Sequence, residues 1–189
     1  QDGELRKVSL MRWGLVPSWA ADLSGGARMI NARSETAAEK PSFREALQRR
    51  RCLIPADAFY EWQRHTSAKQ PFCIEVGDAE VFAFAGLWDS WRGPNGKDVE
   101  TCTILTTTAN EALADVHDRM PVILPRENFE RWLDCRMQDA EEAAGMLTSL
   151  DAGKIKLYPV STRVNQVAND GPECSEPAEL APVNLSLFD

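Results

Sequence analysis

The chain has 189 residues, of which 43% are hydrophobic and 26% charged, and this composition is typical of a folded globular protein rather than a disordered one. Its apolar runs all fall short of the roughly 20 residues that cross a bilayer, and no signal-peptide pattern opens the chain, so we expect an intracellular, cytoplasmic protein with no membrane partner. The net charge of −8 argues against a polyanionic partner for the surface as a whole. Residues 1–70, however, carry 12 Lys and Arg against 8 Asp and Glu, which makes the first third the place to expect a basic face.

The first third of the chain predicts one strand and one helix. Arg6–Leu15 alternates in the manner of a strand, and Pro17-Ser18-Trp19 then breaks the pattern. Ser42 and Glu45 form a Ser-x-x-Glu capping box, which predicts a helix through Leu47 to about Arg50. The Arg49–Arg51 run lies at the end of that helix, where cations oppose the helix dipole favourably, and we interpret it as a solvated helix end in preference to a phosphate contact.

Short β-like runs dominate the middle of the chain. They are separated by polar or Gly- and Pro-containing turns, which is typical of a mostly antiparallel sheet. The runs cover residues 52–55, 58–63, 71–76, 81–88 and 101–107.

Helical patterns return in the last part of the chain, at Asn110–Ala114, Pro125–Leu133 and Asp139–Leu150, and residues 156–160 predict a late strand. Because the order does not alternate strand with helix, the predicted fold class is α+β: a single strand-rich domain with a mostly antiparallel or barrel-like sheet and a few short helices. We place this domain at residues 1–169. Residues 170–189 have five acids, no bases and three prolines, and predict an extended acidic tail.

The cysteines and histidines predict no metal or redox site. The five cysteines form no Cys-x-x-Cys pair, and His65 lies in a polar turn far along the chain from His117, so we expect reduced thiols, no zinc and no cofactor. The three that lie in apolar runs are expected in the core. These three are Cys52, Cys73 and Cys102, and the other two are Cys135 and Cys174.

Glu61 is the first candidate for chemistry, because it is flanked by aromatic residues in "FYEW". Period two places it on the same strand face as Phe59. A carboxylate beside an aromatic ring in a water-poor site has a raised pKa and can transfer protons near neutral pH. The alternative, a Glu on the solvent face of an edge strand, is equally consistent with the sequence.

Two pairs of polar residues share an i, i+2 spacing. Asn31 and Arg33 point the same way if their segment is extended, and they offer an amide and a guanidinium suited to phosphate, although a structural turn is the commoner use of such a pair. His117 and Arg119 repeat the spacing in "ADVHDRMP". A histidine is the natural acid or base near neutral pH, and Asp115 or Asp118 is available to fix its tautomer, although a structural histidine is the commoner case.

Six segments together resemble one family in order and spacing. They are "MRWGLVPSW", "INARSETA", "CLIPADAFYEW", "TILTTTAN", "VHDRMPVIL" and "YPVS", which run from about Met11 to about Ser161. The chain is thereby identified as a member of the SRAP family, the SOS-response-associated peptidase-like proteins that sense abasic sites in single-stranded DNA. The resemblance implies a compact, mostly β fold with a positively charged DNA groove, a nucleoid-associated location in a bacterial-type cell, and a monomer.

The resemblance also implies a covalent chemistry. In the family, removal of the initiator methionine exposes an N-terminal cysteine, and this self-processing gave the peptidase name. The α-amine of that cysteine attacks the aldehyde of the abasic site to form an imine, and its thiol closes a thiazolidine ring. The product is a stable crosslink that shields the lesion from strand cleavage.

Each candidate residue gains an implied role from the family. Asn31 is similar to the asparagine that orients the terminal cysteine, Glu61 to the glutamate that manages protons around the amine and aldehyde, and His117 to the acid/base on the sugar ring oxygen. The implied DNA contacts are Arg33 and Arg119 on phosphates, Thr106 through its backbone, and Trp19 as an aromatic that can stack on a base. Trp13 lies in the same motif as Trp19, and we expect it in the core.

The chain departs from the family at its start. Family members begin Met-Cys-Gly-Arg, whereas this chain begins Gln1-Asp2-Gly3 and has no cysteine before Cys52. The expectation is therefore that an N-terminal segment of roughly 30 to 45 residues is missing from the printed chain, or that the nucleophile has been lost. In either case the printed chain is expected to bind DNA without crosslinking it.

Three functions follow from these expectations. The leading hypothesis is a covalent sensor of abasic sites in single-stranded DNA. The alternative is a non-covalent module that binds single-stranded or junction DNA and lacks the nucleophile. A protease that acts on other proteins is disfavoured, because the chain has no Ser/His/Asp or Cys/His set.

Overall fold

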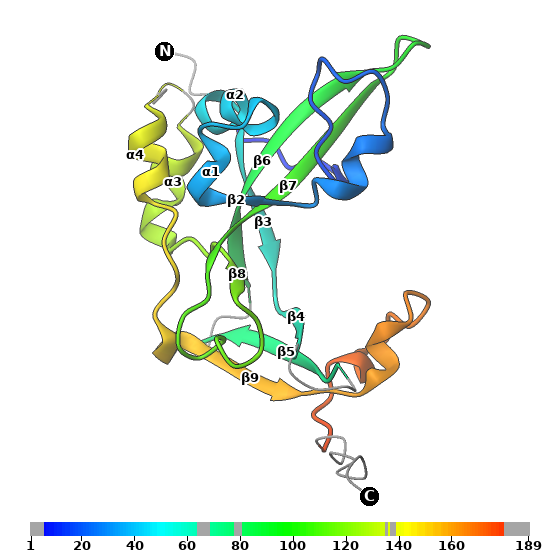
Figure 1. The fold of residues 1–189 in the computed structure, drawn as a ribbon, viewed down its shortest axis with the longest axis vertical. Helices are drawn as coiled ribbons and strands as arrows, with labels where there is room; N and C mark the ends of the chain where they lie inside the picture. The colour runs from blue at the N-terminus through cyan, green and yellow to red at the C-terminus, as the bar shows by residue number, and fades with distance from the viewer. Residues whose placement is uncertain (1–5, 64–68, 78–80, 135, 137–138, 180–189) are drawn as a thin grey trace, which may run out of the picture. The chain divides into compact units, whose positions relative to one another are not determined.

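The computed structural model describes residues 6–63, 69–77, 81–134, 136 and 139–179. Strands and short helices alternate irregularly along the chain, and the long strand pairs are antiparallel, so the predicted strand-rich α+β class is confirmed (Figure 1). The chain divides into two compact units. The first contains residues 1–54, 85–106 and 125–147, and the second contains residues 55–84, 107–124 and 148–189.

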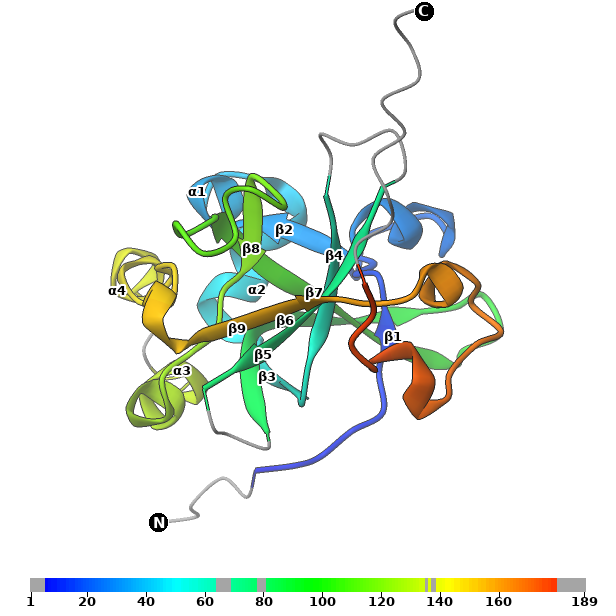
Figure 2. The same ribbon diagram turned by 90° about the horizontal axis from the view of Figure 1, so that it is seen from below.

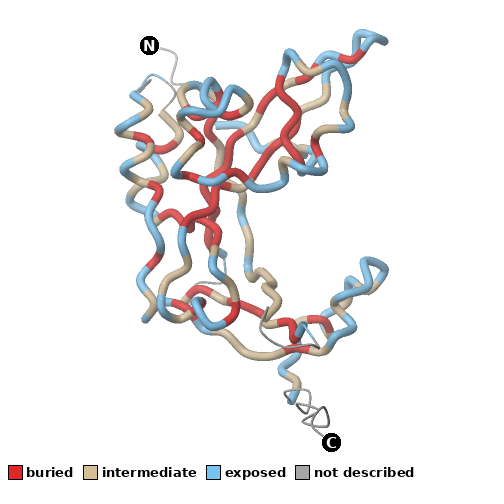
Figure 3. Tube along the Cα trace, viewed as in Figure 1, coloured by how far each residue is buried: buried red, intermediate tan, exposed pale blue. Residues whose placement is uncertain are grey.

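Two long antiparallel strands, β6 (Phe82–Arg92) and β7 (Asp98–Thr108), form the centre of the first unit with their residues 85–92 and 98–106, and their remaining residues belong to the second unit. They pair from Gly86 opposite Ile104 to Arg92 opposite Asp98. Figure 3 shows buried residues along most of both strands. Phe, Ala, Leu and Trp fill most of the buried positions of β6, and Thr fills most of those of β7; aromatic and β-branched side chains pack well on a pleated surface.

Two short strands share one edge of β7. β1 (Arg12–Trp13) and β2 (Asn31–Arg33) both run parallel to it, and β3 (Arg51–Ala56) lies beside β6 on the other side of the sheet. The predicted strand Arg6–Leu15 is therefore wrong in length. Val8 and Leu10 are fully exposed, so no buried face supports a strand ahead of Arg12.

Gly14 ends β1. Its φ of +111° lies in the left-handed region, and a Cβ at this position would come within 2.5 Å of the Gly26 carbonyl oxygen. This close approach brings the segment after Gly14 back towards η1 (Ser24–Arg28).

The predicted helix after Lys40 is present as α2 (Pro41–Arg49). It buries Phe43, Ala46 and Leu47, which are spaced i, i+3, i+4 on one helical face. The predicted capping box is wrong, because Lys40 is the N-cap and Pro41 opens the first turn, where its fixed φ suits a helix.

The other helices of the first unit are shorter than the sequence predicted. The pattern at 125–133 forms η2 (Arg126–Asn128) and α3 (Phe129–Leu133), and the pattern at 139–150 forms only α4 (Ala140–Gly145), which Asp139 caps through two backbone amides. α1 (Ser34–Ala37) follows β2 directly.

The arginine run after α2 is not one solvated end. Arg49 is exposed, as predicted, but Arg51 is only 3% exposed, and for Arg51 the prediction is wrong. Its guanidinium donates to the carbonyl oxygens of Leu47 and Gln48 at the end of α2 and of Trp132 and Asp134 at the end of α3. One buried cation therefore satisfies the free carbonyl groups of two helix ends.

An antiparallel sheet of three strands lies in the second unit (Figure 2). Its order is β4 (Phe59–Trp62), β5 (Pro71–Val76) and β9 (Ile155–Pro159), so the strands predicted from these three sequence runs are present. Phe59 packs edge-on against Phe84 and Phe82, with ring centroids 5.6 and 6.4 Å away. These rings form the apolar layer beneath β4.

The predicted helix Asn110–Ala114 is wrong, because this segment forms turns ahead of β8 (Arg119–Pro121). The Asn110 side chain accepts a hydrogen bond from the Leu113 amide and donates to the Leu150 carbonyl, and the backbone bonds from Ala114 to Asn110 and from His117 to Leu113 form separate turns instead of a helix.

Short 3₁₀ turns complete the second unit. They are η3 (Ala152–Lys154), η4 (Thr162–Asn165) and η5 (Pro172–Cys174). Beyond η5, Pro177 bridges to Val160 and the Ala178 amide donates to the Pro159 carbonyl, so the acidic segment up to residue 179 follows β9. The rest of the predicted tail lies outside the described residues.

Candidate functional site

Glu61 and His117 lie close together in the second unit. The Glu61 Oε2 atom is 4.0 Å from His117 Nε2, and the two side chains are 22% and 15% exposed. β4 carries Glu61, and the turn ahead of β8 carries His117. The fold thus brings together an acid and a histidine that are 56 positions apart in the sequence.

Aromatic residues surround the base of Glu61. It faces Phe72 across the β4–β5 pair, and Phe59 lies two residues before it on the same strand face. The prediction that Glu61 lies beside aromatic rings is confirmed. The alternative of a solvent-facing glutamate is wrong, since most of the side chain is buried.

Backbone groups orient the His117 ring. The Arg119 amide donates to Nδ1 over 2.9 Å, and Nδ1 also lies 3.0 Å from the Arg119 carbonyl oxygen. The Arg119 N–H donates to Nδ1, which favours the neutral tautomer that carries its proton on Nε2. That nitrogen is the one nearest Glu61.

The structure distinguishes the two aspartates that flank His117. Asp118 Oδ1 lies 3.3 Å from Nδ1, whereas the Asp115 carbonyl accepts a hydrogen bond from the Gln63 side chain. Asp118 is thus placed to stabilise a protonated ring, in which Nδ1 becomes a donor.

Asn31 and Arg33 occupy β2 in the first unit, and both are exposed. They pair in parallel register with Ile104 and Thr106 of β7. Their side chains project from the same strand face, as the sequence predicted for an extended segment. Thr106 is buried and its hydroxyl donates to the Ala32 carbonyl over 3.5 Å.

Trp13 lies along the same edge of β7 as Asn31 and Arg33. It pairs with Cys102, two positions before the Ile104 partner of Asn31, and its indole N–H donates to the Ile30 carbonyl over 2.8 Å. The ring is 54% exposed, so the expectation that Trp13 is a core residue is wrong. The short β1 strand buries neither of its two residues.

The remaining predicted residues belong to different segments. Trp19 lies in the loop after β1 and is 66% exposed, and Arg119 begins β8 in the second unit. The structure therefore groups Asn31, Arg33 and Thr106 with Trp13 in one unit, and Glu61 and His117 with Arg119 in the other.

The sequence patterns do not single out Asp89, which is buried in β6 and forms an ion pair with Arg50. A signal was present, because "WDSW" places a carboxylate inside an otherwise apolar strand. A buried carboxylate requires a charged or hydrogen-bonding partner, and that partner is far away in the sequence.

The described cysteines are structural. Cys73, Cys102 and Cys174 are buried, as expected for the first two, and Cys52 is half-buried. Burial, with a smaller contribution from nearby Cys102, raises the pKa of the Cys52 thiol to about 12, which keeps it neutral and unreactive at physiological pH. Cys135 lies outside the described residues.

Within the described ranges, no group of three or more His, Cys, Asp or Glu residues could hold a metal ion. His65 lies outside those ranges. Among the helices that the structure describes, none is long and apolar enough to cross a membrane.

The fold and the site define a strand-rich α+β protein with a paired acid and histidine, and known proteins with related sequences identify the class. The family model described as SOS response associated peptidase (SRAP) matches residues 1–167. The chain is 47% identical over 176 residues to the abasic site processing protein YoqW of Bacillus subtilis, which covers 93% of this chain and 79% of YoqW. This chain therefore belongs to the SRAP family.

Two further known proteins resemble this chain at lower sequence identity. The abasic site processing protein HMCES of Gallus gallus is 37% identical over 203 residues, covering 95% of this chain and 60% of HMCES. A crystal structure of a Bacteroides thetaiotaomicron protein is 32% identical with a TM-score of 0.82, covering 89% of this chain and 76% of that one.

Proposed function

We propose that this protein senses abasic sites in single-stranded DNA and traps them as a thiazolidine crosslink to an N-terminal cysteine that is exposed by removal of the initiator methionine. The observation that carries the proposal is the Glu61–His117 pair, held 4.0 Å apart in a chain that is 47% identical to an abasic site processing protein. A separation longer than a hydrogen bond allows each group to act on a third partner.

His117 opens the sugar. The ring oxygen of the closed abasic deoxyribose must gain a proton as its bond to C1′ breaks, and the C1′ hydroxyl must lose one as it becomes the aldehyde. The protonated His117 ring donates its Nε2 proton to the ring oxygen as the C1′ bond breaks, and the neutral ring then accepts the C1′ hydroxyl proton at Nε2, which restores the protonated ring. Asp118 supports this role, since its Oδ1 atom lies 3.3 Å from Nδ1.

Glu61 transfers protons during formation of the imine. The cysteine α-amine, oriented by Asn31, attacks the aldehyde carbon, and Glu61 takes a proton from the nitrogen. Glu61 delivers this proton to the carbonyl oxygen to give the carbinolamine, and then carries the second nitrogen proton to that hydroxyl, which leaves as water and gives the imine. The cysteine sulfur then adds to the imine carbon, and the thiol proton ends on the ring nitrogen. Cys52, Cys73, Cys102, Cys135 and Cys174 cannot replace this nucleophile, because an internal cysteine has no free α-amine.

The proposal also assigns the DNA contacts. The Arg33 and Arg119 guanidinium groups contact phosphates, Thr106 contributes a backbone contact, and Trp19 stacks on a base. The exposure of Arg33 and Trp19 supports these roles. The contacts with phosphate make binding dependent on salt.

The test is an assay for a covalent product. A form of the protein that starts Met-Cys is incubated with single-stranded DNA bearing an abasic site, and the mixture is resolved under denaturing conditions. We expect a crosslinked band that survives denaturation, and mass spectrometry of the protein should show that the methionine has been removed.

Two results would change the proposal. DNA that binds but never crosslinks, with an N-terminal cysteine verified by mass, would establish the alternative of a non-covalent DNA-binding module. Equal binding of intact and abasic strands would remove the lesion from the function altogether.

A further inference from the structure

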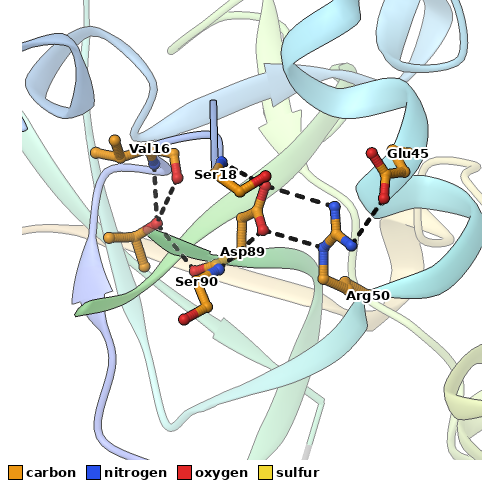
Figure 4. Close-up of polar contacts among 7 residues, drawn as sticks. Val16, Ser18, Glu45, Arg50, Asp89 and Ser90 are labelled. Carbon is orange, nitrogen blue, oxygen red and sulfur yellow. Dashed lines mark hydrogen bonds and ion pairs between the residues drawn. The ribbon is translucent and has the colours of Figure 1, made fainter. Parts of the chain in front are cut away.

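The segment from Val16 to Ala20 is tied to the β6–β7 pair at every second residue. The Val16 amide donates to the Thr101 hydroxyl over 2.8 Å, the Ser18 amide to Asp89 Oδ2 over 3.0 Å, and the Trp91 indole N–H to the Ala20 carbonyl over 2.7 Å. Asp89 and Thr101 are directly opposite each other in the strand register. Figure 4 shows the Val16 and Ser18 contacts converging on these neighbouring strands.

Asp89 is the central member of this set. It is 5% exposed, and both of its carboxylate oxygens have partners: Oδ1 accepts from the Ser90 amide and Oδ2 from the Ser18 amide. The Arg50 guanidinium lies against both oxygens, with Nε 3.2 Å from Oδ1 in an ion-pair geometry that is not a directed hydrogen bond, and Nη2 3.5 Å from Oδ2. Arg50 in turn donates to Glu45 over 3.0 Å (Figure 4).

The charge pair compensates for the burial of Asp89. A carboxylate withdrawn from water requires an opposite charge or several donors, and here it has both. The Arg50 guanidinium therefore offsets the cost of burying the Asp89 carboxylate, which is a strong acceptor for the Ser18 amide.

Trp19 stands between the two anchored residues. Ser18 is held by Asp89 and Ala20 by Trp91, yet the Trp19 side chain is 66% exposed. A large exposed aromatic ring on a fixed backbone loses little conformational entropy when it stacks on a ligand. The anchors therefore have a consequence for binding as well as for packing.

We propose that the Arg50–Asp89 pair is a positioning device that fixes the Ser18 backbone and thereby presents Trp19 to an unstacked base of single-stranded DNA. The inference rests on the proposed function, because it assigns the device to the DNA contact of Trp19. Asp89 and Arg50 touch no DNA in this scheme and act only through the loop.

The test is a double-mutant cycle between Asp89→Asn and Trp19→Ala. The probe is a single-stranded oligonucleotide that carries a tetrahydrofuran abasic analogue, and its affinity is measured by fluorescence anisotropy. We expect Asp89→Asn to weaken binding about tenfold in the wild-type background and less than about twofold in the Trp19→Ala background, because residues that act through one another are not additive. The same tenfold loss in both backgrounds would overturn the proposal.

Hydrogen exchange tests the loop itself without DNA. The Ser18 amide of Asp89→Asn should exchange about tenfold faster or more than in the wild type, with Leu105 in β7 unchanged. Unchanged exchange at Ser18 would overturn the positioning role. Wild-type protein that binds no oligonucleotide would instead overturn the proposed function, and the exchange result would still decide whether Asp89 holds the loop.

One further variant serves as a control for the double-mutant cycle, and another replaces Asp89→Asn if that variant does not fold. Asp98→Asn is the matched control, because Asp98 lies on the same strand pair in an exposed ion pair with Arg92, 3.8 Å apart, and should change neither affinity nor Ser18 exchange. If Asp89→Asn does not fold, Arg50→Gln replaces it in the cycle, since it removes the charge partner and leaves the carboxylate in place.

Discussion

The first unit and the second unit use charged side chains in opposite ways. In the first, Arg51 and Asp89 are almost completely buried, and each has three or more partners in the surrounding backbone and side chains. In the second, Glu61 and His117 are partly exposed and 4.0 Å apart, beyond hydrogen-bond distance of each other.

Under the proposed function, this difference separates structural charges from reactive ones. A structural charge in a protein interior is saturated with partners, because an unpaired buried charge is too costly. A reactive charge must remain able to gain or lose a proton when substrate arrives. Geometry at the side chain, rather than residue type or burial alone, carries this distinction.

The largest expected effect is on chemistry in the second unit. Glu61→Gln should slow crosslinking of abasic single-stranded DNA about 10²- to 10⁴-fold, since general acid–base catalysis contributes a factor of this size. The free energy of unfolding should change by less than about 1 kcal/mol. In a form that starts Met-Cys, crosslinking kinetics measure the rate and urea unfolding measures the free energy of unfolding. The His117→Ala variant should slow crosslinking by a similar factor.

Glu111→Gln, which alters an exposed glutamate in the same unit, is the control and should crosslink at the wild-type rate. If both Glu61→Gln and His117→Ala crosslink at the wild-type rate, the pair has a structural role and the two units do not differ in how they use charged side chains.

The opposite pattern is expected for Arg51. Arg51→Met removes the donor for four backbone carbonyls and should lower the free energy of unfolding by about 3 kcal/mol, measured by urea denaturation. Arg49→Met, in the same run but exposed, should change it by less than about 0.5 kcal/mol. A loss below about 1 kcal/mol for Arg51→Met would show that burial of this cation is not structural.

The raised pKa of the Cys52 thiol predicts a loss of stability at alkaline pH. Its folded-state pKa of about 12 lies above the ordinary value of 9.0, so the folded protein holds this proton more tightly than the unfolded chain. The stabilisation is complete below pH 9 and is lost as the pH rises towards 12. Between these values one such group lowers the free energy of unfolding by about 1.4 kcal/mol per pH unit.

Cys52→Ala should reduce the steepness of this decline by about one proton, measured by urea unfolding from pH 8 to 10.5. An unchanged slope would mean that the other groups whose pKa burial raises, Tyr60, Cys73, Cys102 and Tyr158, account for the alkaline loss.

The smallest expected effects concern phosphate contacts, where the two units should behave alike. Arg33→Ala and Arg119→Ala should each weaken binding of single-stranded DNA several-fold and reduce the slope of log K against log salt by about 0.7, the value for one phosphate contact on a single strand. Binding titrations at several salt concentrations measure the slope. Unchanged slopes in both variants would reject these two contacts.

Local patterns predicted most of the fold. Alternating and apolar runs located β3, β4, β5, β6, β7 and β9, because a strand's own side chains decide which of its faces is buried. The failures lie where a distant partner decides the structure. At Asn110 a side chain bonds to Leu150, 40 positions away, and turns replace the predicted helix.

The candidate site was predictable in its members but not in its geometry. Glu61 was recognised by its aromatic neighbours and His117 by its residue type, whereas the choice of Asp118 over Asp115 required the turn itself. Arg51 and Asp89 were missed as structural charges, since their partners come from α3, α2 and the Trp19 loop, which no local pattern connects to them.

The shared edge of β7 has a consequence for how this fold can diversify. The chain leaves that edge at Gly14 and returns at Ile30, and both ends of the excursion are bonded to β7. Val16, Ser18 and Ala20 are anchored to β6 and β7, so residues are best inserted between Ala20 and η1, where they leave Asn31 and Arg33 in register, and doubling the excursion would cost only about 0.6 kcal/mol of closure entropy. Evolution or design can thus change the length of this excursion while Asn31 and Arg33 keep their register on β7.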